Sequence, residues 1–565
     1  MLDAGGSNDP RGATRTTERA AWTLVWLGVI IGGVDLWGSW SAWPLGGLIA
    51  PLVVVGGIGG IAAVWLVHSP RSVAMQVITM GSVLLSTGCQ QAVGIHARQY
   101  YTTDSGAFNQ VAARLLMHGI NPYTATMAPA NRLLQTASNN WTYTVTGGFV
   151  DHVSYPAGSF LLQVPAMFLG FHHQIVDWMD LGAWLVTGVL IFVLLPSSVR
   201  WVAPLLILTG VFTDVFSSGG TDAIFLPFLV VAVWRWDSFC RGPGFGAARW
   251  IGPIALGLAC SIKQSPWFCV PFLAAALFIE ARSSGRRPAR LALGYLAIVV
   301  GVFGMVNLPF IIWQPAAWAR GTLLPFNDPL VADGQGLVTL ALHGIVRGVS
   351  LPLLTVAGVL VYVALLAALV VWYPQMKRIW MLLLPLTFFV ATRSLSSYLL
   401  DLYPAAIVAA VCVAPASRPA LARPTGRLNL PFGLAAVVPA VAAVVVSILA
   451  FGSPPLQIEV RSFAASQAAL SMNSVTVEVH NTTDKRLEPH FMVTIGSGHP
   501  NGFWYTTGHR PVVLPSHGSA VVTLHPPAYV FAPAHGSHWL VVAYTSSPEA
   551  LSTSPLQFWR LGKPK

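Results

Sequence analysis

Charged side chains are scarce in this 565-residue chain, where Asp, Glu, Lys and Arg together make up 9% of the residues. A soluble domain of ordinary composition contains roughly 25%. Hydrophobic residues make up 54%, and the mean hydropathy is +0.64. The composition excludes an ordinary soluble protein and is typical of a chain that crosses a membrane many times.

The sequence also lacks the usual signs of a cofactor or metal. A zinc motif, a phosphate-binding glycine-rich loop and a serine nucleophile elbow are missing. Asn327, Asp328 and Asp333 carry suitable oxygen ligands, but their spacing is generic, so neither a metal nor a cofactor is expected. The five cysteines match no metal or disulfide spacing and are interpreted as packing residues. They are Cys89, Cys240, Cys260, Cys269 and Cys412.

The formal net charge of +11 comes from short basic clusters between apolar runs. This pattern indicates membrane topology under the positive-inside rule and gives no sign of a nucleic-acid partner. We place all the clusters in the cytoplasm, which makes residues 1–20 a cytoplasmic tail. The clusters are Arg11, Arg15 and Arg19; Arg71; Arg235, Arg241 and Arg249; Arg282, Arg286, Arg287 and Arg290; Lys377 and Arg378; and Arg418, Arg423 and Arg427.

The apolar runs predict a polytopic α-helical domain over residues 21–452, with about 13 spans of a cell membrane. One further run, 158–170, is short and contains Pro165. We expect it to be re-entrant or interfacial, which puts Arg200 in the cytosol and requires a cavity around the broken backbone. The expected spans are 21–37, 46–67, 73–95, 181–197, 201–216, 222–236, 249–262, 266–281, 289–312, 351–372, 379–392, 398–414 and 429–452.

Residues 453–565 change to a period-two pattern with polar turns, which predicts an antiparallel, immunoglobulin-like β-sandwich. Because the span count is odd, this domain is expected on the extracytoplasmic side. Aromatic residues in its loops either stack on sugar rings or pack within the domain; they are Trp504, Tyr505, Tyr529 and His509. The expected strands are 457–460, 474–479, 491–495, 520–524 and 539–544.

The polar loop 98–157 lies outside the membrane in this topology and begins with an acid, Asp104. The apolar spacing of 108–117 predicts a helix at the membrane interface, and Gly119-Ile120-Asn121-Pro122-Tyr123 predicts a turn. The loop closes with Asp151-His152-Val153-Ser154-Tyr155-Pro156.

These elements resemble the first extracytoplasmic loop of the GT-C superfamily of polyprenol-phosphate-sugar-dependent glycosyltransferases. The likeness is strongest to the bacterial mannosyl- and arabinofuranosyltransferase branch that contains the phosphatidylinositol mannoside elongating enzymes. In that branch an acid precedes an amphipathic helix, a Gly-x-Asn/Asp-Pro-Tyr turn and a Tyr-Pro-Pro motif. Here the last motif is Tyr155-Pro156-Ala157, one proline short.

The resemblance continues to about residue 412. Gly219-Gly220-Thr221-Asp222 lies where the family often has Gly-Gln-x-Asp. Gly257 to Pro266 is similar to its Gly-Leu-Ala-x-x-x-Lys-x-x-Pro signature, which places Lys263 at the lysine. Further similar positions are Asn307-Leu308-Pro309-Phe310 with Trp318, and Arg393 with Tyr398 and Tyr403-Pro404.

The resemblance implies an inverting transfer of a mannose-like or pentose sugar from a polyprenyl-phosphate carrier to a hydroxyl of a lipid or glycan acceptor. Such a transfer needs a base for the hydroxyl and positive groups for the departing phosphate. Asp104 is the expected base, and Lys263 and Arg393 are the expected phosphate ligands. The remaining expected substrate-binding residues are Tyr101, Asn121, Tyr123, Asp151, His152, Tyr155, Asp222, Gln264 and Tyr398.

Other interpretations stay open. Asp104 can be a helix-end cap or a loop salt-bridge partner, Asp222 an N-cap, and Lys263 a side chain that reaches lipid headgroups. A transporter or flippase of lipid-linked sugars would share the span count and the buried cation, but it would show repeated halves, which the sequence lacks. A third possibility is a scaffolding protein whose working part is the β-domain.

Overall fold

The computed structural model describes residues 10–38, 44–66, 72–98, 100–136, 140–240, 249–414, 429–466, 471–495, 502–527, 531–533 and 536–559. Within these ranges the chain is mostly helical, with a β-rich region at its C-terminal end. Seven of the described helices are long and apolar enough to cross a membrane. They are α1 (Pro10–Gly38), α2 (Pro44–Leu66), α3 (Val73–Ala97), α8 (Ile175–Leu194), α14 (Pro288–Trp313), α18 (Leu351–Val371) and α24 (Asn429–Ala450).

The other expected spans are built from shorter helices. Several of these begin with a proline in the first turn, where its missing N–H costs nothing, so proline sets the breaks in the apolar runs. The shorter helices are α9 (Val202–Leu208), α10 (Gly210–Phe216), α11 (Leu226–Val233), α12 (Ile251–Ile262), α13 (Cys269–Ser283), α20 (Trp380–Leu383), α21 (Pro385–Val390), α22 (Ser396–Leu400) and α23 (Tyr403–Cys412).

Helix α1 begins at Pro10, so the predicted tail 1–20 is helical from that residue onward. Its continuous backbone hydrogen bonding extends a helix beyond the apolar run that the membrane requires. Several predicted cytoplasmic residues lie outside the described residues: Arg71, Arg241, Arg418, Arg423 and Arg427.

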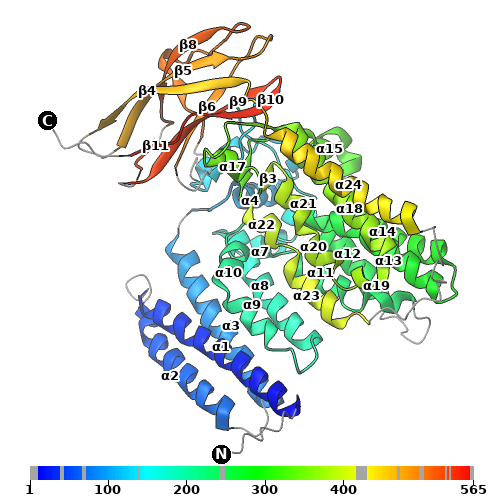
Figure 1. Ribbon diagram of the computed structural model, residues 1–565. Helices are drawn as coiled ribbons and strands as arrows, with labels where there is room; N and C mark the ends of the chain where they lie inside the picture. Colours follow the sequence, from blue (N-terminus) through cyan, green and yellow to red (C-terminus); the bar gives the residue numbers. More distant parts are fainter. Residues whose placement is uncertain are drawn as a thin grey trace, which may run out of the picture.

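Figure 1 shows α1, α2 and α3 side by side at the blue end of the chain, where α1 packs against α9, and α3 against α8 and α9, of the main helical body. The β-rich region covers one end of that body, next to α4 (Asp104–Met117) and α17 (Thr339–Leu342). The loop that carries Asp104 is therefore enclosed between helices and strands.

Segment 158–170 forms α6 (Gly158–Leu161) and α7 (Val164–Phe168) in place of one long helix. Its start lies against the end of α12, where a Cβ on Gly158 would lie 2.5 Å from the Ser261 carbonyl oxygen. Just beyond its end, the His172 carbonyl accepts a 2.8 Å hydrogen bond from Gln110 in α4. These two short helices agree with a segment that does not cross as a single span.

Arg200 follows α8 and lies beside the first turn of α3. Its Nη1 is 3.5 Å from Gln76 Oε1, and Gln76 Nε2 donates to the Ser197 carbonyl at 3.0 Å. Helix α8 therefore runs from the loop 98–157 to the end of the molecule where α3 begins. Expected spans 181–197 and 201–216 lead away from that loop and back.

The β-rich region, residues 456–558, contains two antiparallel sheets that share a hydrophobic core. One sheet has the order β4-β5-β8-β7. The other has the order β11-β9-β10-β2, with β6 also paired to β9. All five expected strands are present, and three short strands were missed: β7, β10 and β11. The bounds are β4 (Leu456–Ser466), β5 (Ser471–Asn481), β6 (His490–Ile495), β7 (Tyr505–Thr506), β8 (Ser519–His525), β9 (His538–Ser546), β10 (Glu549–Thr553) and β11 (Gln557–Phe558).

Strand β2 (Gly348–Ser350) comes from the segment just before α18, yet it pairs with β10. The membrane part of the chain thus donates a strand to the C-terminal sheet. Near it, β1 (Asp333–Gly334) and β3 (Arg393–Ser394) form a short parallel pair. All five cysteines are free, as expected of packing residues.

Candidate functional site

Asp104 is the first residue of helix α4, and Thr103 caps that helix. The Thr103 side chain accepts a hydrogen bond from the Gly106 amide at 3.2 Å, which satisfies one of the free N–H groups of the first turn. An acid in the first turn is also favoured by the helix dipole. The expected amphipathic helix 108–117 therefore begins four residues earlier, at Asp104 itself.

Asp104 is buried, with 8% of its surface exposed. Its Oδ2 accepts a hydrogen bond from the Thr142 amide, with 2.6 Å between nitrogen and oxygen. Burial raises the pKa of this carboxyl above its ordinary value, although the hydrogen bonds to Thr142 and the charge of Arg393 lower it. Desolvation destabilises the charged carboxylate, so Asp104 is a stronger base than an exposed aspartate.

Three residues from distant segments lie in the same region as Asp104. Burial raises the pKa of the Tyr155 phenol, and nearby Tyr398 and Asp104 raise it further, while a hydrogen bond with the Ser105 side chain and the charge of Arg393 lower it. These charge effects act over several ångströms, so the groups lie in one region of the protein. The structure therefore brings together Asp104, Tyr155, Arg393 and Tyr398, four of the residues expected from the sequence.

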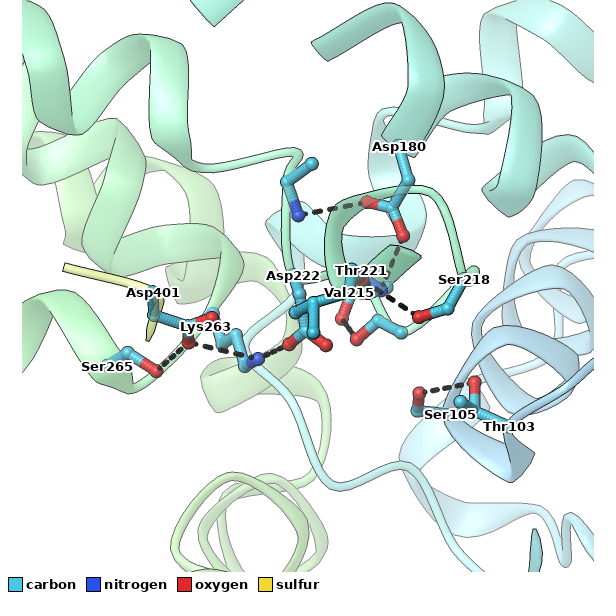
Figure 2. Close-up of polar contacts among 12 residues, drawn as sticks. Thr103, Ser105, Asp180, Val215, Ser218, Thr221, Asp222, Lys263, Ser265 and Asp401 are labelled. Atoms are coloured by element: carbon cyan, nitrogen blue, oxygen red, sulfur yellow. Dashed lines mark hydrogen bonds and ion pairs between the residues drawn. The ribbon is translucent and has the colours of Figure 1, made fainter. Parts of the chain in front are cut away.

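Lys263 lies in a second, connected group. Its ammonium forms ion pairs with Asp222 and, at 3.3 Å, with Asp401, and only 2% of its surface is exposed. Ser265 Oγ donates to Asp401 Oδ2 at 2.9 Å, and Figure 2 shows these groups in one line. The Tyr398 ring centre lies 5.5 Å from the ammonium. Tyr398 therefore joins the Lys263 group to the Asp104 group.

The turn 218–223 connects the Asp104 group to the Lys263 group through hydrogen bonds. The hydroxyl groups of Thr102 and Thr103 donate to the carbonyls of Ser218 and Gly219, the second bond at 3.0 Å. Asp180 in α8 accepts the Thr221 and Ala223 amides at 3.0 and 3.2 Å (Figure 2). Together these bonds fix the Asp222 side chain toward Lys263. Asp222 is an ion-pair partner in the structure, which the N-cap interpretation did not include.

Other expected binding residues serve to hold the fold. Gln264 donates to the Ser154 and Thr322 carbonyls, each at 2.8 Å. The Tyr101 hydroxyl donates to Gln110 and accepts the Val176 amide at 3.3 Å. Their polar groups are thus occupied by protein atoms, and substrate roles for both remain untested predictions.

The expected turn at 119–123 is confirmed. Gly119 has φ of +74°, and the Asn121 side chain accepts the Tyr123 amide at 3.1 Å. The Tyr123 hydroxyl donates to the Tyr155 carbonyl at 2.7 Å. Asn121 and Tyr123 therefore position the segment that presents Tyr155.

Asp151 lies at the surface and contacts the partly buried His152. His152 Nδ1 is 3.4 Å from Asp151 Oδ1, and the Asp151 side chain is 55% exposed. Its other partner is the Thr126 hydroxyl, at 3.3 Å. These contacts involve neither Asp104 nor Arg393, so the structure leaves this pair outside the central group.

Sequence reasoning missed several buried acids, among them Asp177, Asp180 and Asp401. Each interrupts an apolar run, and an ionisable residue at membrane depth is a functional-site hypothesis by default. That signal would have found them. Asp401 and Asp180 have partners as described above, whereas neither oxygen of Asp177 has a hydrogen-bond partner in the described part of the chain.

No cluster of three or more His, Cys, Asp or Glu residues suited to a metal ion occurs among the residues that the structure describes. Comparison with known protein families, with curated proteins and with solved structures found no match for this chain.

Proposed function

We propose that this protein is a membrane glycosyltransferase of the GT-C type. It transfers a mannose-like or pentose sugar from a polyprenyl-phosphate carrier to a hydroxyl group of a lipid or glycan acceptor. Asp104 is the general base, and no cofactor takes part. The observation that carries the proposal is the Asp104 carboxylate, which is buried, held by the Thr142 amide, and close to one arginine and two tyrosines.

In this reaction the acceptor oxygen attacks the anomeric carbon of the sugar as Asp104 takes the hydroxyl proton. The bond between that carbon and the phosphate oxygen breaks, and the polyprenyl phosphate leaves with the bonding electrons. Arg393 stabilises the negative charge of this leaving group, because its planar guanidinium suits a phosphate. Direct displacement inverts the configuration of the anomeric carbon.

The role of Lys263 differs from the phosphate contact expected from the sequence. Two carboxylates already surround its ammonium, so with all three side chains ionised the group has a net charge of −1 and would repel a phosphate. We assign Lys263 to organising Asp222 and Asp401 behind Tyr398. Arg393 remains the phosphate ligand.

The proposal includes a topology. About 13 spans, a cytoplasmic N-terminus and an extracytoplasmic β-sandwich put Asp104 outside the cytoplasm, where donors carried by lipids are used. Support comes from the seven long apolar helices, from Arg200 beside the start of α3, and from the two β-sheets around one core.

The test is sugar transfer by purified protein in nanodiscs, from a panel of synthetic polyprenyl-phosphate mannose and pentose donors to lipid and glycan acceptors. Loss of the base predicts that Asp104→Asn lowers kcat by roughly 10²–10⁴-fold. Asp151→Asn is the matched control, because it removes an exposed acid from the same loop. Full activity of Asp104→Asn would exclude Asp104 as the base.

The second candidate is a transporter or flippase of lipid-linked sugars. It is favoured by Asp177, which lies in the membrane-length helix α8. This carboxylate is fully buried and has no hydrogen-bond partner in the described part of the chain. Buried ionisable residues of this kind occur in many translocation pathways. Labelled polyprenyl-phosphate sugar in proteoliposomes separates the two. Movement of the lipid across the bilayer, without transfer to any acceptor, would replace the glycosyltransferase proposal.

A further inference from the structure

The sheet that faces the membrane part of the chain is buried on both sides. In β5 the side chains alternate between buried and more exposed positions, as in a strand with one solvated face. In β9 every residue from Trp539 to Thr545 is buried. A β-domain that folded as a free module would leave one face of such a strand in water.

The two faces of β9 belong to different cores. Trp539, Val541 and Ala543 pack into the core shared by the two sheets. Leu540, Val542 and Tyr544 pack into a second core with residues of the membrane part. From that part come Tyr143, Val145, Val331, Ala332, Val349 and Leu354. The second core therefore closes directly over the loops of the candidate site.

Phe503 lies where the β-rich region meets the Asp104 loop. Its ring centre lies 5.5 Å from that of Tyr143, 5.7 Å from that of His490 and 6.5 Å from that of Tyr544. Tyr143 directly follows Thr142, whose amide holds Asp104. A single peptide unit thus separates the aromatic contact from the hydrogen bond to the candidate base.

Tyr544 makes an equivalent connection to Arg393. Its hydroxyl donates to the Ala332 carbonyl at 3.2 Å, and the preceding carbonyl, of Val331, accepts Arg393 Nη1 at 3.4 Å. The Val331 amide in turn donates to the Tyr143 carbonyl at 2.9 Å. The segments under Phe503 and Tyr544 are therefore hydrogen-bonded to each other.

We propose that the β-rich region forms one wall of the candidate site, and that Phe503 and Tyr544 are positioning residues for Asp104 and Arg393. The pairing of β2 with β10 fixes this wall to the membrane part through backbone hydrogen bonds, with Leu551 opposite Val349. The wall itself does not depend on the proposed function. The expected effect on catalysis does rest on the proposed function.

Amide hydrogen exchange of the full-length protein in nanodiscs tests the wall without any substrate. Phe503→Ala removes the ring from Tyr143, so segment 140–150 is expected to exchange roughly tenfold faster, the size of a lost aromatic pair. Tyr544→Phe removes one hydroxyl and is expected to affect segment 329–334. Phe463→Ala is the control, because Phe463 is 41% exposed and its ring contacts Trp539 within the β-rich region.

Activity adds a second readout. A misplaced base lowers kcat far more than it changes the KM for the donor, and a shift of about 1 Å can cost on the order of 10²-fold. We expect this pattern for Phe503→Ala, with recovery in Phe503→Tyr, which keeps the ring. Phe463→Ala is expected to have wild-type kcat.

Unchanged exchange of 140–150 in Phe503→Ala, together with unchanged exchange of 329–334 in Tyr544→Phe, would overturn the wall. If all segments of Phe503→Ala exchanged faster, this variant would be globally destabilised. The exchange of segment 329–334 in Tyr544→Phe, which preserves apolar volume, would then decide whether the wall exists. If the exchange results held but Asp104→Asn were fully active, the wall would stand and the proposed function would fail.

Discussion

The Lys263 ammonium lies 5.5 Å from the centre of the Tyr398 ring, and this contact connects two groups of ionisable residues. On one side of Tyr398 are Asp222 and Asp401, which both form ion pairs with Lys263. On the other side is Asp104 with Arg393, whose charges both act on Tyr398. The proposed base and the proposed phosphate ligand thus occupy one region, next to a buried and already paired lysine.

The pH dependence of transfer should report Asp104. Burial raises the pKa of this carboxyl above its ordinary value of about 4, and only the deprotonated form accepts the acceptor proton. Activity should therefore rise with pH through that raised pKa, so kcat/KM has an acid limb above pH 4. A rate that is independent of pH from 4 to 8 would contradict this assignment.

Arg393 should be needed for the donor phosphate. Arg393→Gln removes the charge, and loss of one such stabilising group typically costs about 10²–10³-fold in kcat. The matched control is Arg320→Gln in α15 (Pro315–Thr322), because Arg320 is exposed. Steady-state kinetics with a polyprenyl-phosphate sugar measures both variants, and an equal effect in the two would remove Arg393 from the site.

Lys263→Met should act on stability. It leaves Asp222 and Asp401 without their cation in a buried position, which costs about 3–5 kcal/mol when one partner of a buried pair is removed. We expect a lower thermal unfolding temperature, with partial recovery in Lys263→Met combined with Asp401→Asn. Unchanged stability with weaker donor binding would instead support the phosphate role expected from the sequence.

Gly219→Ala should destabilise the turn that joins the two groups. Gly219 has φ of +73°, and a Cβ there would lie 1.8 Å from Asp177 Oδ1. Gly170→Ala is the control for backbone strain alone, because Gly170 has φ of +88° and open space around its Cβ. Left-handed strain costs both variants roughly 1–2 kcal/mol. Only Gly219→Ala should lose further stability in thermal unfolding, and equal losses would show that the turn tolerates the side chain.

Labelling of single cysteines should reveal the topology, in a variant whose five native cysteines are replaced. Ile120 is 46% exposed at the turn after α4, and Ser197 is exposed at the turn after α8. We expect a membrane-impermeant maleimide to label Ile120→Cys in intact cells, and Ser197→Cys only after permeabilisation. Labelling of Ser197→Cys in intact cells would reverse or break the proposed threading.

The sequence determined the elements of this protein well. Apolar runs near 20 residues predicted α3, α8, α14 and α18, because a helix that crosses a membrane must satisfy its backbone internally and be apolar. Period-two alternation predicted β5 and β8, because successive side chains of a strand point to opposite faces of the sheet. Short strands such as β10 were missed, because a short segment becomes a strand only through the strands with which it pairs.

Individual candidate residues could also be chosen from the sequence, since Asp104, Lys263 and Arg393 are charged residues beside apolar segments. What each of them does depends on residues far along the chain. Lys263 is paired because positions 222 and 401 meet there, and Asp104 is held by the amide of residue 142. Only the tertiary structure decided these pairings, because contacts between distant segments arise from the packing of whole helices and leave no periodic signal in the sequence.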